Sequence, residues 1–323
     1  MFSVSTATKR RKKEYIQEQL ANPDNLITIV ELCEIAGVSR SSYYNWLNTK
    51  QGRNRREEQD RKDFQRILDN YNYRGYAKGS RSIYMHLRAQ GDVMNRKKIQ
   101  RLMNKYSLFC PIRKANPYRR MQKATKASTY AKNRARRNWG NFGPGQMVET
   151  DITYLIYGKH NSKKAYLSTM KDACTHQILS YVLSDSLKEN FVLETVDNLL
   201  KNHGSQLSKN VVCHSDQGVH YSAQEYVKKL KKYNIKRSMS RRSNCWDNAP
   251  QESFFGHMKD EINITDCNTF AELKYCIDDY MDYYNNDRYQ WKLCKMTPNE
   301  YNKYIRKGNY IIPGKDKIKV KGA

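Results

Sequence analysis

The sequence predicts small all-helical domains followed by one larger α/β domain. Three observations support this division of its 323 residues. A helix-turn-helix pattern lies between residues 27 and 47, a strongly basic stretch comes later, and near residue 147 the hydrophobic period changes from helical to alternating. We therefore expect five segments: helical domains at 1–50 and 51–112, a basic linker at 113–143, an α/β domain at 144–305 and a basic tail at 306–323.

The charge of the chain predicts a polyanionic partner. The formal net charge is +27, from 59 Lys and Arg against 32 Asp and Glu, which is more than solubility requires. A membrane surface is the rival to nucleic acid, but no segment approaches the roughly 18 consecutive apolar residues of a spanning helix. The start "MFSVSTATKRRKKEY" lacks the apolar stretch of a secretory signal. We expect a cytoplasmic protein that binds DNA and has no membrane partner.

The eight cysteines do not indicate a metal site. They are scattered, with no C-x-x-C pair and no Cys/His spacing of the zinc type. We expect them to be reduced and to act as small hydrophobic side chains.

The first helix-turn-helix is predicted in "ITIVELCEIAGVSRSSYYNWL". Ile29, Leu32 and Ile35 form the apolar side of its first helix. Gly37 supplies the turn, and Val38 is expected to pack inward. The predicted DNA contacts lie at the start of the second helix: Ser39, which also caps it, Arg40 and Ser41.

A second helical group is predicted between residues 58 and 108. Its helices are expected around Arg61–Tyr71, Ser80–Ala89 and Asn95–Lys105. "QGDV" makes a turn, Asn95 caps the last helix, and both the helix dipole and the basic side chains there favour phosphate contact. The predicted DNA contacts are Arg96, Lys97 and Lys98. Helical pairs of this kind also occur in bundles that bind no nucleic acid, so that alternative stays open.

A basic stretch without acidic residues precedes the α/β domain. Between Val93 and Val148 there are fifteen Lys and Arg and no Asp or Glu. We expect this stretch to contact phosphates, and the alternative is a solvated connector. The predicted contacts are Arg119, Arg120, Arg136 and Arg137.

The α/β domain begins with three short strands, "MVETDITYLI", "KAYLSTM" and "QILSYVL", which are expected to pair antiparallel. A helix, the buried strand "NVVCHSD", a second helix and the strand "IKRSM" follow. Two helical stretches, Asn248–Ile264 and Thr269–Asn286, complete the domain. These elements predict a mixed sheet with helices on its faces.

Three carboxylates are placed by these elements where they could act together. Asp151 lies on the first strand, on the opposite side from Val148 and Ile152, and Asp216 follows a strand at its carboxyl end. Glu252 and Lys259, seven residues apart, share the polar face of a helix. The buried stripe of that helix is predicted from the four-residue recurrence of Phe254, Met258 and Ile262.

Carboxylates from separate elements in a cationic protein predict a site for Mg²⁺. Two such ions about 3.5–4 Å apart would activate a water or a 3′-hydroxyl and stabilise the leaving oxygen at phosphorus. Each residue alone has another explanation: Asp151 as an edge charge, Asp216 as a turn former, and Glu252 as a first-turn acid favoured by the helix dipole.

The chain resembles the insertion-sequence transposases of the IS-three family over roughly residues 60–305. The resemblance lies in "TDITY", "HSDQGVHYS", "SMSRRSNCWDNAPQESFFGHMKDE" and "YYNNDR" followed by "MTPNEY". It implies a ribonuclease-H-like catalytic domain of the retroviral-integrase type, with a triad of Asp, Asp, thirty-five residues and Glu. That pattern matches Asp151, Asp216 and Glu252, since 252 − 216 leaves thirty-five residues between the last two.

The resemblance also implies roles for residues around the triad. Lys259 matches a basic residue that contacts DNA near the reacting phosphate, and "RRSNCWDNAP" matches the active-site loop, with Asn248 as a DNA contact. Either Asn248 or Asp247 could instead cap the following helix, and that role is expected for Asp247. Two departures concern packing around the first strand: Val148 replaces a usual tryptophan, and "KDACTH" replaces a block that usually ends in Ser-Arg.

Two further polar residues are expected to be structural. Asp172, in the departing block, is interpreted as a strand-end residue. His214 precedes Asp216 on a strand and is expected to pack or to form hydrogen bonds, and not to act as a general base.

The predicted function is that of a bacterial, nucleoid-associated transposase, a homo-oligomer on DNA. It would bind the terminal inverted repeats of its element and target DNA, and catalyse strand cleavage and strand transfer with two Mg²⁺ ions, for which Mn²⁺ could substitute. A DNA-binding repressor on an inactive fold and a nuclease that cleaves without joining are the alternatives. Family members often frameshift from an upstream frame, so whether this chain is the full enzyme or a downstream subunit stays open.

Overall fold

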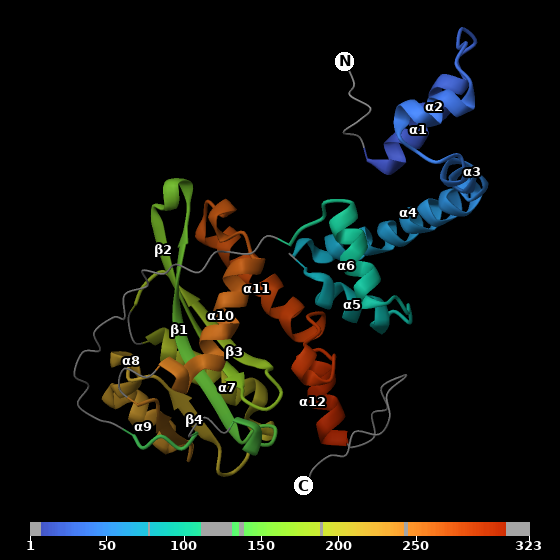
Figure 1. Ribbon diagram of the computed structural model, residues 1–323. Coiled ribbons are helices and arrows are strands. Elements are labelled where there is room, and N and C mark those ends of the chain that lie inside the picture. The colour runs from blue at the N-terminus through green and yellow to red at the C-terminus, as the bar shows by residue number, and fades with distance from the viewer. Residues whose placement is uncertain are drawn as a thin grey trace. The chain divides into compact units, whose positions relative to one another are not determined.

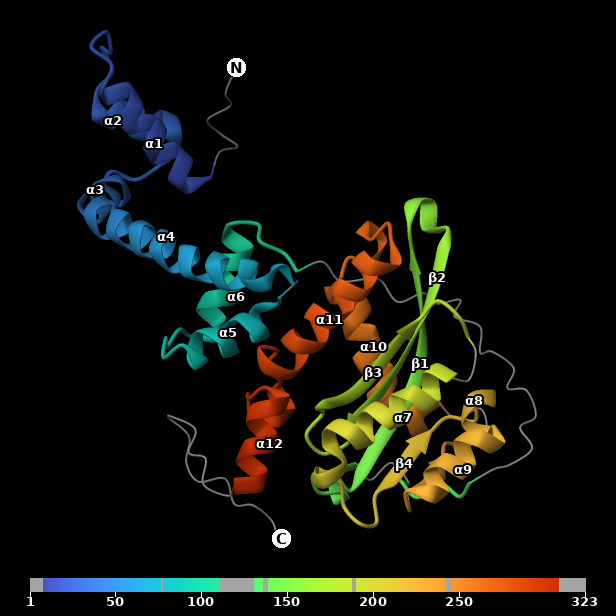
Figure 2. The ribbon, with the colours of Figure 1, turned by 180° about the vertical axis from the view of Figure 1, so that it is seen from behind.

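The computed structural model describes residues 8–76, 78–110, 131–135, 139–187, 190–241 and 245–307 (Figures 1 and 2). They divide into two compact units, the first ending at Leu68 and the second beginning at Asp69. Among these residues, no helix is both long enough and apolar enough to cross a membrane.

The first unit is helical. It contains α1 (Lys9–Leu20), α2 (Ile29–Ala36), α3 (Arg40–Asn48) and most of α4 (Lys50–Asn72). Its core consists of Ile16, Leu32, Cys33, Ala36 and Tyr43. The sequence patterns did not predict α1, whose Ile16 closes this core.

The predicted turn of the first helix-turn-helix is confirmed. Gly37 has a φ of 61°, in the left-handed region that suits glycine, and the hydroxyl of Ser39 accepts a hydrogen bond from the amide of Ser42 at 3.3 Å. The predicted apolar side was wrong at Ile35, which is 58% exposed. Because α1 packs against α2, Cys33 and Ala36 take the buried positions instead.

The second helical group also matches its prediction. It consists of the end of α4, α5 (Ser80–Ala89) and α6 (Arg96–Lys105). The side chain of Asn95 caps α6 by accepting from the amide of Lys97 at 2.8 Å. The first predicted helix is longer than expected, since α4 begins at Lys50 and not near Arg61.

The α/β part is built on one five-stranded sheet. The strands are β1 (Met147–Tyr157), β2 (Lys163–Asp172), β3 (Ile178–Ser184), β4 (Val212–Ser215) and β5 (Lys236–Met239). Their order is β3-β2-β1-β4-β5, with the first three antiparallel and β1, β4 and β5 parallel. The predicted mixed sheet is confirmed.

Helices cover both faces of the sheet. One core lies under α7 (Asn190–His203), α8 (Val219–Ser222) and α9 (Gln224–Lys232), and the other lies under α10 (Ala249–Glu261) and α11 (Phe270–Asn286). The chain continues into α12 (Pro298–Lys307) (Figure 1). The short 3-10 helices are η2 (Tyr73–Gly75), η3 (Trp139–Asn141), η4 (Lys159–Asn161), η5 (Gly204–Gln206), η6 (Cys245–Asn248), η7 (Ile264–Asp266) and η8 (Trp291–Leu293).

The predicted stripe of α10 is confirmed. Phe254, Met258 and Ile262 are at most 8% exposed and belong to the second of these cores. The helix therefore packs on the sheet with Glu252, on its polar side, exposed.

Asp172 has the structural role that was expected. Its buried carboxylate accepts hydrogen bonds from the amides of Gly145 at 2.6 Å and Thr175 at 2.7 Å, so it joins the start of β1 to the turn after β2. Gly145 has a φ of 73°, and a Cβ there would lie 2.4 Å from the carbonyl oxygen of Gln206. Only glycine fits at this position without strain.

Gly145→Ala is therefore expected to destabilise the fold by at least about 1–3 kcal/mol, because it adds left-handed strain to a clash with backbone. Gly204→Ala is the matched control, since a Cβ at Gly204 meets nothing within 4 Å. Denaturant unfolding of both variants measures the difference. Equal stabilities would contradict the packing described at Gly145.

Candidate active site

The sheet register brings Asp151 and Asp216 to adjacent strands. In the parallel pair β1 and β4, Glu149 lies opposite His214. Asp151 and Asp216 each follow two residues later, on the same side of the sheet as those residues. Neighbouring strands are about 4.8 Å apart, so the two aspartates lie side by side where β4 ends.

A buried contact from β2 holds α10 beside this pair. Thr169 lies directly opposite Asp151 in the β1/β2 ladder. Its hydroxyl accepts a hydrogen bond from the side chain of Gln251, the residue before Glu252. The first turn of α10, and Glu252 with it, is therefore positioned over the strand that carries Asp151.

A buried ion pair makes a second contact with the same turn. Lys171 lies opposite Glu149, and its ammonium is 3.0 Å from Oε2 of that carboxylate. The same ammonium donates a hydrogen bond to the carbonyl oxygen of Pro250 at 2.7 Å. Both side chains are at most 3% exposed. Burial raises the pKa of Glu149, and the charge of Lys171 opposes that rise.

Asp216 is held in a tight turn after β4. Its Oδ1 accepts a hydrogen bond from the amide of Gly218 at 2.8 Å. A Cβ at Gly218 would lie 2.9 Å from the same oxygen, so glycine leaves room for the carboxylate. Burial raises the pKa of Asp216, and the Gly218 amide opposes the rise.

The charges of all the other predicted catalytic residues shift the pKa of Asp151. Burial and then the charge of Asp216 raise its pKa well above the ordinary value, and the charge of Glu252 adds to the rise. The amide of Ile152, which donates to Asp151 at 2.8 Å, and the ammonium of Lys259 oppose it. Asp216, Glu252 and Lys259 therefore each lie within electrostatic reach of Asp151.

In the described part of the chain, these side chains do not form a coordination sphere for a metal ion. Within the described residues, no three His, Cys, Asp or Glu side chains are placed together so that they could hold one metal ion. Glu252 is exposed, whereas Asp151 and Asp216 are partly buried.

Asp247 does not cap α10, which corrects the sequence prediction. Its buried carboxylate forms two hydrogen bonds with the guanidinium of Arg241, at 2.9 and 3.0 Å, and accepts another from the side chain of Asn133 at 3.0 Å. The cap position belongs to Asn248, whose side chain makes no capping hydrogen bond. Asp247 instead ties the loop before α10 to residues 131–135, one of the two described parts of the predicted linker.

His214 has the structural role that was expected. Its Nε2 donates to the carbonyl oxygen of Asp247 at 2.9 Å, and its Nδ1 is 2.8 Å from the hydroxyl of Ser238, which fits a neutral ring. Burial lowers its pKa. The histidine thus links β4, β5 and the loop before α10.

The predicted DNA contacts have different surroundings. Ser39, Arg40 and Ser41 are exposed at the start of α3, and Arg96 and Lys97 are exposed at the start of α6. Lys98 is half-buried, and Asn248 is buried with no hydrogen-bond partner for its amide oxygen in the described part of the chain. Arg119, Arg120, Arg136 and Arg137 lie outside the described residues. All of these contacts stay predictions.

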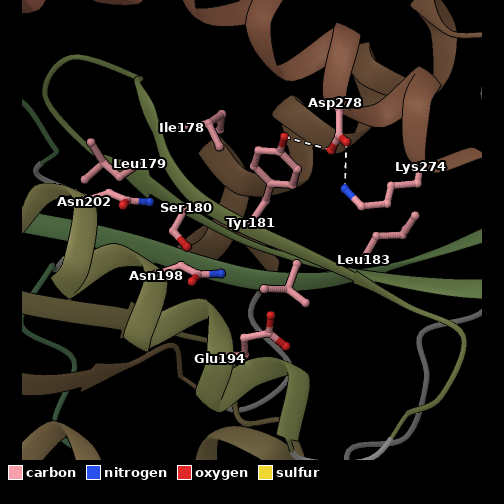
Figure 3. A pocket seen from close by; sticks show the side chains of 11 residues that line it. Ile178, Leu179, Ser180, Tyr181, Leu183, Glu194, Asn198, Asn202, Lys274 and Asp278 are labelled. Atoms are coloured by element: carbon pink, nitrogen blue, oxygen red, sulfur yellow. Dashed lines mark hydrogen bonds and ion pairs between the residues drawn. The ribbon is translucent and has the colours of Figure 1, made fainter.

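A separate cavity lies at the β3 edge of the sheet, away from the predicted catalytic residues. It measures about 430 Å³ and is lined by β3, by α7 and by Lys274 and Asp278 of α11 (Figure 3). Asp278 accepts hydrogen bonds there from Tyr181 at 2.9 Å and Lys274 at 2.7 Å. None of the predicted catalytic residues lines it.

Three segments of this chain match models of known protein families. Residues 142–245 and 252–304 match models of the integrase core domain, and residues 58–116 match an HTH-like domain. The putative transposase InsK for insertion sequence element IS150 of Escherichia coli is 33% identical over 274 residues, which cover 84% of this chain and 92% of that protein. The chain belongs to the insertion-sequence transposases. Its fold is ribonuclease-H-like, and its class of enzyme is the polynucleotidyl transferases.

Other relatives of this transposase carry related names. The insertion element IS600 31 kDa protein of Shigella sonnei is 26% identical, covering 83% of this chain and 96% of that protein. Transposase InsF for insertion sequence IS3A of Escherichia coli is 25% identical, covering 72% and 79%. Among solved structures, the integrase catalytic core domain of HTLV-2 matches this chain with 18% identity and a TM-score of 0.39, covering 49% of this chain and 97% of that one.

Sequence reasoning missed the residues that position α10 in the transposase. Thr169 and Lys171 were not singled out in "KAYLSTMKDACTH", nor was Gln251 beside Glu252. Lys171 could have been recognised from the sequence, because a lysine inside an otherwise apolar strand is rarely buried without a partner.

The ion pair predicts a distinctive result for a double variant. Lys171→Met leaves Glu149 unpaired in the core and is expected to cost about 3–5 kcal/mol in unfolding free energy. Adding Glu149→Leu removes the stranded carboxylate and should recover most of that loss. Denaturant unfolding measures both, with Lys236→Met at an exposed lysine as control. A double variant as unstable as the single one would contradict this account.

Proposed function

We propose that this transposase is a member of the IS-three family that binds the terminal inverted repeats of its element and catalyses Mg²⁺-dependent cleavage and transfer of DNA strands. Asp151, Asp216 and Glu252 are its catalytic carboxylates, and Lys259 contacts the DNA end. The observation that carries the proposal is geometric: the sheet register puts Asp151 and Asp216 on adjacent parallel strands, and Gln251 holds the turn that carries Glu252 over the strand of Asp151.

The residues fit a hard divalent cation by their chemistry. Carboxylate oxygens are the donors that Mg²⁺ prefers, and a cation would offset the burial and the neighbouring negative charge that raise the pKa of Asp151. Asp151 and Asp216 would hold the metal from adjacent strands, and Glu252 would have to approach them from α10. When bound, the metal would activate the attacking hydroxyl and stabilise the leaving oxygen at phosphorus.

The remaining groups act on position and charge. Thr169 and Lys171 hold the turn that carries Glu252. Lys259, two turns further along α10, supplies a positive charge beside the carboxylates that would attract a DNA phosphate.

Two helix-turn-helix elements support end recognition. In this type of motif the amino-terminal residues of the second helix face the DNA, where they contact base edges in the major groove or adjacent phosphates. Arg40 has that place in α3, and Arg96 and Lys97 have it in α6, where all three are exposed. The net charge of +27 supports additional contacts with phosphates.

The catalytic assignment predicts a separation of binding from chemistry. Glu252→Gln should keep specific binding of the element's end, because recognition resides in α3 and α6, but should lose both cleavage and joining. The measurement uses a labelled end with Mg²⁺, scored for nicked and joined products. Glu225→Gln is the matched control, since Glu225 is also an exposed first-turn acid, on α9, and should keep full activity.

The same assay tests the alternatives. Wild-type cleavage without joined product would indicate a nuclease, and end binding without either product would indicate a repressor. Near wild-type cleavage and joining by Glu252→Gln would refute the assignment of the triad.

The recognition assignment predicts two kinds of binding defect. Arg40→Ala should cost about 1–3 kcal/mol and relax sequence preference if Arg40 contacts a base edge. Replacing Arg96 and Lys97 with Gln should weaken binding to all sequences if they contact phosphates. Binding titrations on end and unrelated DNA separate the two, with Lys231 and Lys232 of α9 replaced as the control. Unchanged end binding in both variants would remove these helices from recognition.

A further inference from the structure

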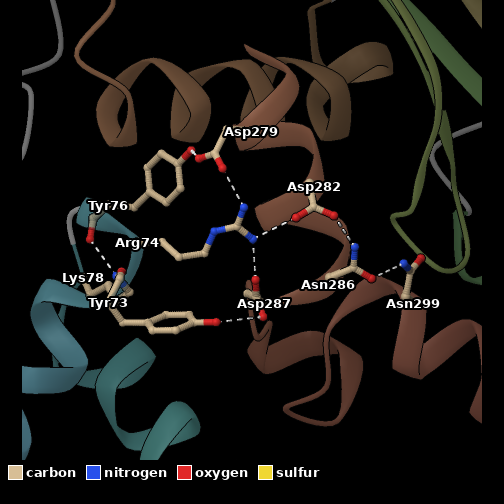
Figure 4. A network of polar contacts seen from close by, with 9 residues as sticks. All are labelled: Tyr73, Arg74, Tyr76, Lys78, Asp279, Asp282, Asn286, Asp287 and Asn299. Atoms are coloured by element: carbon tan, nitrogen blue, oxygen red, sulfur yellow. Dashed lines mark hydrogen bonds and ion pairs between the residues drawn. The ribbon is translucent and has the colours of Figure 1, made fainter. Parts of the chain in front are cut away.

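A cluster of acidic residues on α11 and at its C-cap binds one arginine of the HTH-like region (Figure 4). The guanidinium of Arg74, in η2, contacts Asp279 at 2.7 Å, Asp282 at 2.9 Å and Asp287 at 2.5 Å. The hydroxyl of Tyr76 donates to Asp279, and that of Tyr73 donates to Asp287 at 3.4 Å. We call these six residues the Arg74 clasp.

Aromatic packing surrounds the clasp. The ring of Tyr76 lies 4.3 Å from that of Tyr283 and 5.4 Å from that of Tyr280, both on α11. On α5, the His86 ring meets Tyr289 edge-on at 4.9 Å. The contact between the HTH-like region and the carboxyl-terminal part of the core is therefore both ionic and apolar.

Local contacts fix the backbone conformation around Arg74. Arg74 has a φ of 55° and a ψ of 12°, a left-handed conformation that is uncommon for a residue with a Cβ. Lys78, which is 1% exposed, donates to the carbonyl oxygens of Tyr71 at 3.3 Å, Tyr76 at 2.9 Å and also Tyr73. Local contacts thus fix the turn from which Arg74 reaches the aspartates.

The charge of the cluster argues against a DNA contact at this place. Three aspartates around one arginine leave excess negative charge, which repels phosphates in a chain whose net charge is +27. Holding two parts of the protein together is the role that fits a local acidic cluster here.

The clasp is continuous with the helix that carries Glu252. The Phe254 ring of α10 lies 4.8 Å from that of Tyr284 on α11. At the other end of α10, Glu261 accepts a hydrogen bond from Tyr280 at 3.0 Å and pairs with Arg288 at 2.6 Å. Packed and hydrogen-bonded groups therefore connect η2, through α11, to α10.

We propose that Arg74 is a positioning residue, and that the Arg74 clasp fixes the distance between the DNA segment bound by α6 and the phosphate cut at the active site. This inference rests on the proposed function, in which α6 contacts the element's end and Glu252 acts at the cut. It adds that a single transposase chain sets the spacing between recognition and cleavage through its own folded contacts.

The test uses end substrates in which the spacing between the α6 footprint and the cleavage site grows by single base pairs up to half a helical turn, about 5 bp. Wild-type protein should cleave the natural spacing much faster than the lengthened ones. Arg74→Gln should bind the end as wild type does, cleave the natural substrate less, and cleave the lengthened substrates about tenfold better relative to the natural one than wild type does. Lys274→Gln is the control, because Lys274 also pairs with an aspartate of α11 but lies on that same helix.

The possible results distinguish failure of this inference from failure of the proposed function. Retention of the wild-type spacing profile by Arg74→Gln would overturn the inference while leaving the proposed function intact. Absence of cleavage by wild type, or end binding that does not depend on Arg96 and Lys97, would instead overturn the proposed function. Metal-dependent nicking of DNA without an end reports whether the core is folded. If Arg74→Gln loses that nicking, the double variant Asp282→Asn with Asp287→Asn, which removes two of the three carboxylates around Arg74, is measured instead, and a strict spacing profile there overturns the inference.

Discussion

The first turn of α10 is held to the sheet by two buried side chains of β2, and the position of Glu252 depends on that contact. Thr169 binds Gln251 and Lys171 binds the carbonyl oxygen of Pro250, from strand positions opposite Asp151 and Glu149. A buried lysine is costly to desolvate, so its ion pair with Glu149 contributes little net stability. What the pair provides is a fixed place for α10 above the strand of Asp151.

The same strand positions serve two purposes. Residues of β1 and β2 that face α10 either hold the helix, as Lys171 and Thr169 do, or carry a proposed catalytic carboxylate, as Asp151 does. A slip of one residue in the ladder would turn all of these side chains to the other face. The sheet register is thus a requirement of the candidate site as well as of the core.

The elements of the fold were predictable where one physical signal dominates. Alternation gave the strands, and the four-residue recurrence of Phe254, Met258 and Ile262 gave the buried side of α10. Predictions failed where a distant partner decides. Ile35 is exposed because α1 covers the other side of α2, and Asp247 binds Arg241 in place of capping α10. Likewise, the carboxylates could be named from sequence, but their juxtaposition depends on a parallel register that no local pattern encodes.

The Arg74 clasp joins residues that are 203–214 positions apart in the chain. Synthesis at about 5–20 residues per second needs roughly 10–40 s to make the intervening segment. The HTH-like helices therefore leave the ribosome well before α11 exists to receive them. Lys78 suits this delay, because the three carbonyl oxygens it binds lie within seven residues of it. The turn around Arg74 can thus form as soon as Lys78 has been synthesised, before α11 is available to bind it.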